Sequence, residues 1–201
     1  MKKNVLKQMI LLSAVLLAFS CASGAEPKKT QTASAVKYNW NFTVAGNGTA
    51  GWFLVPDEYW DFHGTAVLSR DEKTFAKPML RMDVDFTKDA NSDWSEPKMK
   101  MQFEKPINNV KKITFDFIYN PAFSKSGNFK SKVIIFNGNK ELASNITDAI
   151  IALDELPNGY VKGTVSLIAA SLEPIDNIIL SIAGYRTNYK GPIFFDNMRL
   201  E

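Results

Sequence analysis

The chain has 201 residues, 45% of them hydrophobic, with 24 lysines and arginines, 21 acidic residues, one histidine and one cysteine. This apolar content is enough for one domain with a hydrophobic core of its own. A lone cysteine excludes a disulfide within the chain. A single histidine leaves one candidate base for a Ser-His-Asp triad and almost no ligands for a zinc site.

The first 25 residues are typical of a bacterial secretion signal. Lysines precede an apolar run over residues 9–19, which is too short for a transmembrane helix because a span needs about 20 apolar residues. Two cleavage sites fit. Ser23–Ala25 offers the small residues that signal peptidase I requires, whereas Ala18–Cys21 is a loose lipobox in which Cys21 becomes the lipidated N-terminus. We therefore expect an extracytoplasmic protein, either secreted or lipid-anchored to the cell envelope.

Removal of this signal changes the charge of the protein. Lys2, Lys3 and Lys7 leave with it, so the mature chain carries 21 basic and 21 acidic residues. A chain without net charge has no simple electrostatic attraction for nucleic acid or for an anionic membrane surface. Residues 26–37 (EPKKTQTASAVK) have no hydrophobic period and are predicted to form a flexible tether.

From residue 38 onward, apolar residues alternate with polar ones, as is typical of β-strands. The alternation is clearest in three segments, residues 80–86, 98–103 and 112–119, and glycine- or proline-containing turns separate the runs. Residues 38–201 are therefore predicted to form one all-β domain, an antiparallel β-sandwich of jelly-roll type with eight to ten strands. Only residues 146–156 suggest a short helix, with Asn145 or Thr147 as its cap.

The acidic residues give little indication of catalysis. A glycoside hydrolase needs two carboxylates at a defined separation, but most carboxylates here lie at alternating, solvent-facing strand positions. We expect no enzymatic activity, and a β-sandwich hydrolase is the least favoured alternative. The only histidine, His63, is expected to be a structural or surface residue.

The strongest functional signal is aromatic. Sugars present flat C–H faces that stack on tryptophan or tyrosine, and hydroxyl groups that polar side chains bind. If the apolar residues of 98–103 point into the core, strand parity places Trp94, Glu96 and Lys98 together on the opposite face. The alternative is that Pro97 breaks this parity and Trp94 enters the core.

Four further residues are candidate sugar contacts because they are aromatic or lie on a polar face: Trp52, Trp60, Arg81 and Tyr185. Trp60 lies in an aromatic, acidic segment without strand alternation, which indicates a loop. Arg81 is taken to lie on a strand next to that of Trp94. Trp52 has a competing interpretation as a core residue, and Trp40 is expected to be buried.

Three motifs together resemble the mannan-binding carbohydrate-binding module of family 27: Gly48–Trp52, Trp94–Met99 and Gly191–Leu200. The Trp-Ser-Glu-Pro-Lys element is the most specific of them, whereas the Phe-Asp-Asn-x-Arg-Leu ending marks the fold more than the ligand. The resemblance covers most of residues 38–201. It implies a galactose-binding-domain-like jelly roll, tryptophans that stack on mannose units on one sheet, and a structural calcium.

Carried over to this chain, the resemblance implies sugar contacts at Trp52 and Trp94 and calcium ligands at Asn41 and Asp196. The family tends to carry a further tryptophan in its second half, which this chain lacks. One stacking subsite is therefore expected either to be missing or to be filled by Phe136 or Tyr185. Such modules usually accompany a β-mannanase. We expect a β-mannan-binding protein that holds polysaccharide near the cell or near secreted mannan-degrading enzymes. The alternative is a jelly-roll module that binds another glycan or serves as an envelope or protein-interaction component.

Overall fold

The computed structural model describes residues 38–40, 42, 48–55, 62–148, 154–169 and 173–201. All of them belong to the compact unit Ser34–Glu201. The predicted signal, the tether and Cys21 lie outside these ranges. Within them, the regular structure consists of strands and short 3-10 helices, and no helix there is long and apolar enough to cross a membrane.

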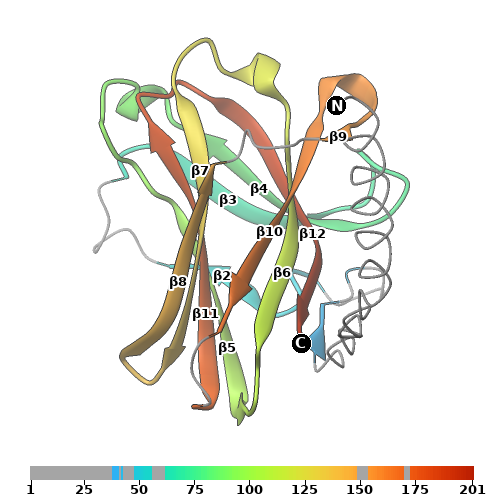
Figure 1. Cartoon of the computed structure of the whole chain (residues 1–201). Helices are drawn as coiled ribbons and strands as arrows, with labels where there is room; N and C mark the ends of the chain where they lie inside the picture. The colour runs from blue at the N-terminus through green and yellow to red at the C-terminus, as the bar shows by residue number, and fades with distance from the viewer. Residues whose placement is uncertain (1–37, 41, 43–47, 56–61, 149–153, 170–172) are drawn as a thin grey trace, which may run out of the picture. The chain divides into compact units, whose positions relative to one another are not determined.

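The strands form two antiparallel sheets (Figure 1). The first sheet has the order β3 (Thr65–Asp71), β4 (Met79–Asp85), β12 (Lys190–Leu200), β6 (Lys112–Tyr119), β10 (Val161–Ile168) and β9 (Asp154–Glu155), with β1 (Tyr38–Asn39) paired to β12. The second sheet has the order β2 (Trp52–Leu54), β5 (Lys98–Ile107), β11 (Ile175–Tyr185), β7 (Asn128–Asn137) and β8 (Lys140–Asp148). The predicted antiparallel β-sandwich is confirmed.

The core lies between the sheets and follows from the alternation in the sequence. Met99 and Met101 of β5 are buried, as are Phe115 and Phe117 of β6, because alternate side chains of a strand point to the same face. Aromatic rings fill much of this layer, and Phe117 lies 5.9 Å from Phe195 in an edge-on arrangement. Trp40 is buried as expected.

A second, smaller core covers part of the outer face of the seven-stranded sheet. Ile118 and Phe194 point outward from β6 and β12, yet they are buried together with Met79 and Tyr160. Phe75, from the loop between β3 and β4, packs edge-on against Phe194 at 5.0 Å. The loops of this sheet therefore bury apolar side chains on the face away from the main core.

The short helix predicted over residues 146–156 is wrong. Residues 140–148 form β8, which pairs with β7, and residues 154–155 form β9; residues 149–153 lie outside the described ranges. Asn145 is not a helix cap, because its side-chain amide donates to the Ser166 carbonyl at 2.9 Å. Pairing with β7 satisfies the backbone of this segment, and tertiary pairing of this kind overrides a weak local preference.

Candidate functional site

Trp94, Glu96 and Lys98 meet on the outer face of the five-stranded sheet, as strand parity predicted. The indole Nε1 of Trp94 donates to Glu96 Oε2 at 2.8 Å, and the Lys98 ammonium lies 3.3 Å from the same oxygen. Trp94 precedes β5, and a bridge between Ser95 and Gly184 fixes this segment against the end of β11. The ring of Trp94 does not enter the core.

Two further residues complete this network, and sequence reasoning missed both. Ser181 of β11 donates its hydroxyl to Glu96 Oε1 at 2.5 Å, and the ammonium of Lys132, on β7, lies 3.8 Å from the same atom. Ser181 is the register partner of both Lys98 and Lys132. Parity alone assigns these residues to a polar face, but only the strand order shows that they share it with Glu96.

The residues of this cluster differ in their exposure to solvent. Glu96 and Lys98 are only 6% and 4% exposed, whereas Trp94 is 39% exposed. Burial lowers the pKa of the Lys98 ammonium, and the negative charge of Glu96 partly offsets that effect. Both oxygens of Glu96 are engaged by neighbouring side chains, so the group acts as an anchor for the indole. The accessible part of the cluster is the ring of Trp94.

Tyr185 lies close to Trp94 at the same end of this sheet. It is 43% exposed, and the bridge between Ser95 and Gly184 places residues 94 and 185 next to each other. The Arg186 guanidinium lies 5.4 Å from the centre of the Tyr185 ring and pairs with Asp93 at 2.7 Å. Two accessible aromatic residues therefore lie at opposite positions of neighbouring segments, which is an arrangement suited to stacking on sugars.

A buried carboxylate supports the segment that leads to Trp94. Asp89, in the short helix η2 (Thr87–Asp89), accepts hydrogen bonds from the backbone N–H groups of His63 and Gly64 at 2.9 and 3.1 Å, and His63 Nδ1 lies 2.8 Å from its other oxygen. Burial opposes ionisation of Asp89, but these hydrogen bonds outweigh it and hold the pKa of Asp89 below its ordinary value. His63 is thus a structural residue, as expected.

Trp52 is not part of this surface. Trp52 is 2% exposed and packs on Trp40 with ring centres 5.5 Å apart, so the prediction that it contacts sugar is wrong for this structure. The small neighbouring residues Gly51 and Ala50 lead the chain into β2, where parity sends the indole inward. Trp60 lies outside the described residues. Phe136 is half-buried on β7, and because it lies four residues from Lys132, strand parity places it on the same face of this sheet as Lys132.

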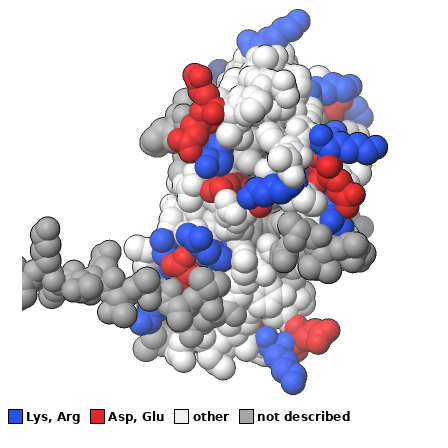
Figure 2. Space-filling model, turned by 90° about the vertical axis from the view of Figure 1, so that its right-hand side faces the viewer, with Lys and Arg blue, Asp and Glu red and all other residues white. Residues whose placement is uncertain are grey.

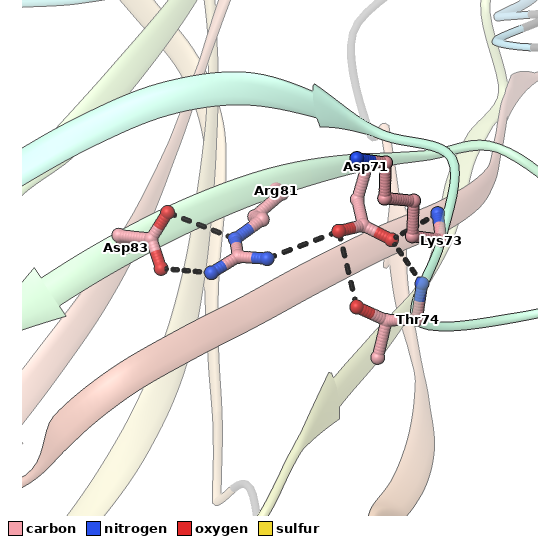
Figure 3. Close-up of polar contacts among 5 residues, drawn as sticks. All are labelled: Asp71, Lys73, Thr74, Arg81 and Asp83. Atoms are coloured by element: carbon pink, nitrogen blue, oxygen red, sulfur yellow. Dashed lines mark hydrogen bonds and ion pairs between the residues drawn. The ribbon is translucent and has the colours of Figure 1, made fainter.

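Arg81 belongs to the other sheet, contrary to the prediction that its strand is next to that of Trp94. Its guanidinium makes two hydrogen bonds to Asp83, at 2.8 and 2.7 Å, and one to Asp71 at 3.0 Å (Figure 3). The hydrogen bond to Asp83 is the main reason that the pKa of Arg81 is raised. Hydrophobic alternation reveals which face of a strand is polar but not which sheet the strand joins, and this ambiguity caused the error.

The implied calcium ligands are not assembled in the described part of the chain. Asn41 lies outside it, and no group of three or more histidine, cysteine or acidic side chains that could hold a metal occurs among the described residues. Asp196 is paired with the Lys77 ammonium at 2.5 Å. Because an ammonium and a calcium ion repel each other, Asp196 Oδ2 in contact with the Lys77 ammonium does not fit a calcium ion at the same oxygen.

Comparison with known proteins agrees with the fold and the motifs. The family model for carbohydrate binding module 27 matches residues 59–201. Among solved structures, the chain is similar to TmCBM27, a carbohydrate-binding module described for specific mannan recognition (TM-score 0.64, 16% identity, covering 83% of this chain and 96% of the other). No curated protein sequence matches the chain.

Two other solved structures share the fold. The first is CBM27-1 of Caldicellulosiruptor saccharolyticus in complex with mannohexaose (TM-score 0.62, 23% identity, covering 84% of this chain and 98% of the other). The second is a CBM28 module specific for non-crystalline cellulose (TM-score 0.57, 16% identity, covering 75% and 88%). At these identities, the likeness shows a shared β-sandwich.

Proposed function

Because the chain belongs to family 27 of carbohydrate-binding modules, which are non-catalytic, we propose that it binds β-mannan chains on the outer face of its five-stranded sheet. Trp94 and Tyr185 supply the stacking surface. The observation that carries this proposal is the exposed indole of Trp94, whose N–H is fixed by a buried carboxylate. Mannan, glucomannan and galactomannan are the ligands of choice.

The fixed indole explains how such a surface binds a flexible chain. A protein loses conformational entropy when it orders a side chain on binding, and an indole that is already held by Glu96 avoids most of that cost. The Glu96 carboxylate is in turn held by Ser181 and Lys98. The sugar then meets a preorganised apolar ring, and the free hydroxyls of the sugar stay in water or meet polar groups at the rim.

Mannan is favoured over other glycans by the family and by the named ligands of two structural neighbours. TmCBM27 is described for mannan recognition, and CBM27-1 was solved with mannohexaose. The CBM28 neighbour, with the same fold, is specific for cellulose. A different β-glucan is therefore the second candidate ligand, and the binding assay has to include it.

The direct test is affinity electrophoresis through gels that contain glucomannan, galactomannan, xylan or cellulose derivatives. Wild-type protein should be retarded by the mannans, and Trp94→Ala should lose most of the retardation while it keeps its circular dichroism spectrum. Tyr38→Ala is a matched control, because Tyr38 is similarly exposed but lies on the other sheet. If no mannan slows the migration of wild-type protein, the proposal is refuted. Release of reducing sugar would refute the non-catalytic assignment.

We place the protein outside the cytoplasm, on the basis of the signal-like segment at residues 1–25 and the tether that follows. Lipidation of Cys21 would hold the module at the envelope, where it keeps mannan close to mannan-degrading enzymes. Cell fractionation and mass spectrometry of the N-terminal peptide test both points. A Cys21→Ala protein that fractionates with the membrane to the same extent as wild type would contradict the lipid anchor. Wild-type protein found in the cytoplasm would contradict the location.

A further inference from the structure

Two carboxylates face each other on the outer side of the seven-stranded sheet. Asp116 of β6 and Asp196 of β12 are register partners, and they are only 6% and 8% exposed. Like charges at directly opposite positions of a sheet destabilise it, and burial strengthens their repulsion. A positive charge near this pair therefore stabilises the fold. Figure 2 shows that basic and acidic side chains are interspersed on this side of the molecule.

Neutral groups satisfy Asp116. The hydroxyl of Thr164 donates to its Oδ1 and the side-chain amide of Asn197 donates to its Oδ2, both at 2.6 Å. Asn197 has a left-handed backbone conformation, with φ of 48°, at the irregularity between Asp196 and Arg199 where the β12–β6 register shifts. This local kink places the Asn197 side chain beside both carboxylates.

The positive charge comes from Lys77, in the loop between β3 and β4. Its ammonium lies 2.5 Å from Asp196 Oδ2 and 3.5 Å from Asn197 Oδ1. Because Asn197 also donates to Asp116, one network links the ammonium to both carboxylates. A second lysine, Lys162, lies within electrostatic range: its pKa is raised mainly by a hydrogen bond to Asp154 and further by the charges of Asp116 and Asp196.

We propose that the Lys77 ammonium takes the place of a divalent cation as the counter-ion of Asp116 and Asp196, so that the fold needs no calcium. Asp196 is the residue that the family resemblance implies as a calcium ligand, and in this chain Lys77 engages both Asp196 and the oxygen of Asn197. An ammonium and a calcium ion cannot occupy the same oxygens, because they repel each other. The inference is independent of any sugar ligand.

The test is thermal unfolding of the mature chain in EDTA and in millimolar calcium. The melting temperature of the wild type should agree within about 1 °C between the two conditions. Lys77→Met should lower it by roughly 5–10 °C, since it removes the only positive charge in direct contact with this mostly buried carboxylate pair among the described residues and leaves it only the field of Lys162. Lys77→Arg should keep most of the stability. Adding Asp196→Asn to Lys77→Met should recover part of the loss, because the repulsion then disappears.

Lys140→Met is the matched control. The Lys140 ammonium lies 2.5 Å from Glu173, the same distance as in the Lys77–Asp196 pair, but both residues of the Lys140–Glu173 pair are exposed. The loss of Lys140 should therefore shift the melting temperature by about 2 °C or less. Two results would overturn the inference. The first is a melting temperature of the wild type that EDTA lowers or calcium raises by several degrees. The second is a melting temperature of Lys77→Met equal to that of the Lys140→Met control.

Discussion

Replacing Glu96 with alanine should reveal how Trp94 is held. The change removes the acceptor of the Trp94 indole and of the Ser181 hydroxyl, and it removes the carboxylate 3.3 Å from the Lys98 ammonium. Breaking a buried ion pair by removing one partner costs about 3–5 kcal/mol. Lys98 is 4% exposed but lies next to the accessible Trp94, where water can enter once the carboxylate is gone. We therefore expect the lower end of that range, about 3 kcal/mol.

For a domain of this size, such a loss corresponds to a melting temperature about 6–12 °C lower. Circular dichroism during heating measures it, and urea titration gives the free energy of unfolding directly. Quenching of tryptophan fluorescence by iodide should increase at the same time, because the Trp94 ring becomes mobile. A Glu96→Leu, Lys98→Met double variant should recover at least half of the stability, since both of the fully buried charges are removed and Lys132 is partly exposed. If Glu96→Ala melts within about 2 °C of wild type, the carboxylate is not the anchor of Trp94.

The remaining predictions concern the core, the second aromatic ring and pH. Trp52→Ala should destabilise the domain by about 3–5 kcal/mol in urea titration, whereas Trp94→Ala should change stability little and binding strongly; the reverse pattern would contradict the assigned roles. Tyr185→Ala should weaken mannan binding in calorimetry, with Tyr185→Phe close to wild type because the ring provides the contact; equal losses in both would implicate the hydroxyl instead. Asp89→Asn should be less stable than wild type at neutral pH. The pKa of Asp89 is lower in the folded state than in the unfolded state. Its ionised carboxylate therefore contributes fully to the free energy of unfolding above the unfolded pKa of about 4, and this contribution is lost as pH falls through the folded pKa. The melting temperatures of the two proteins should converge below about pH 4.

Hydrophobic alternation predicted most of the fold because each strand of a sandwich shows its buried face in its own sequence. Alternation does not predict burial correctly where a strand has apolar side chains on both of its faces. Ile118 points away from the main core, but a satellite core with Phe75 and Tyr160 buries it, and no local pattern reveals such a covering loop. The helix prediction for residues 146–156 was wrong for a related reason. Residues 140–148 are a strand because they pair with β7, and this pairing cannot be seen in their own sequence.

The candidate site was predictable only along a single strand. Trp94, Glu96 and Lys98 are two residues apart in sequence, so parity was enough to group them. Ser181 and Lys132 reach the same carboxylate from β11 and β7, and their grouping depends on strand order, which a single sequence does not contain. Burial of Glu96 and Lys98 was unexpected for the same reason, because side chains from neighbouring strands cover them.

The pairing of Tyr38 with Leu200 has a practical consequence for how the module is oriented. It brings the first and last described strands side by side in the seven-stranded sheet (Figure 1). The Trp94 side chain lies on the outward side of the opposite sheet. A fusion partner or surface support attached at either end of the domain would leave from the layer that does not carry the aromatic rings. The domain can therefore be immobilised or displayed through either end with its ligand-facing side turned toward the solution.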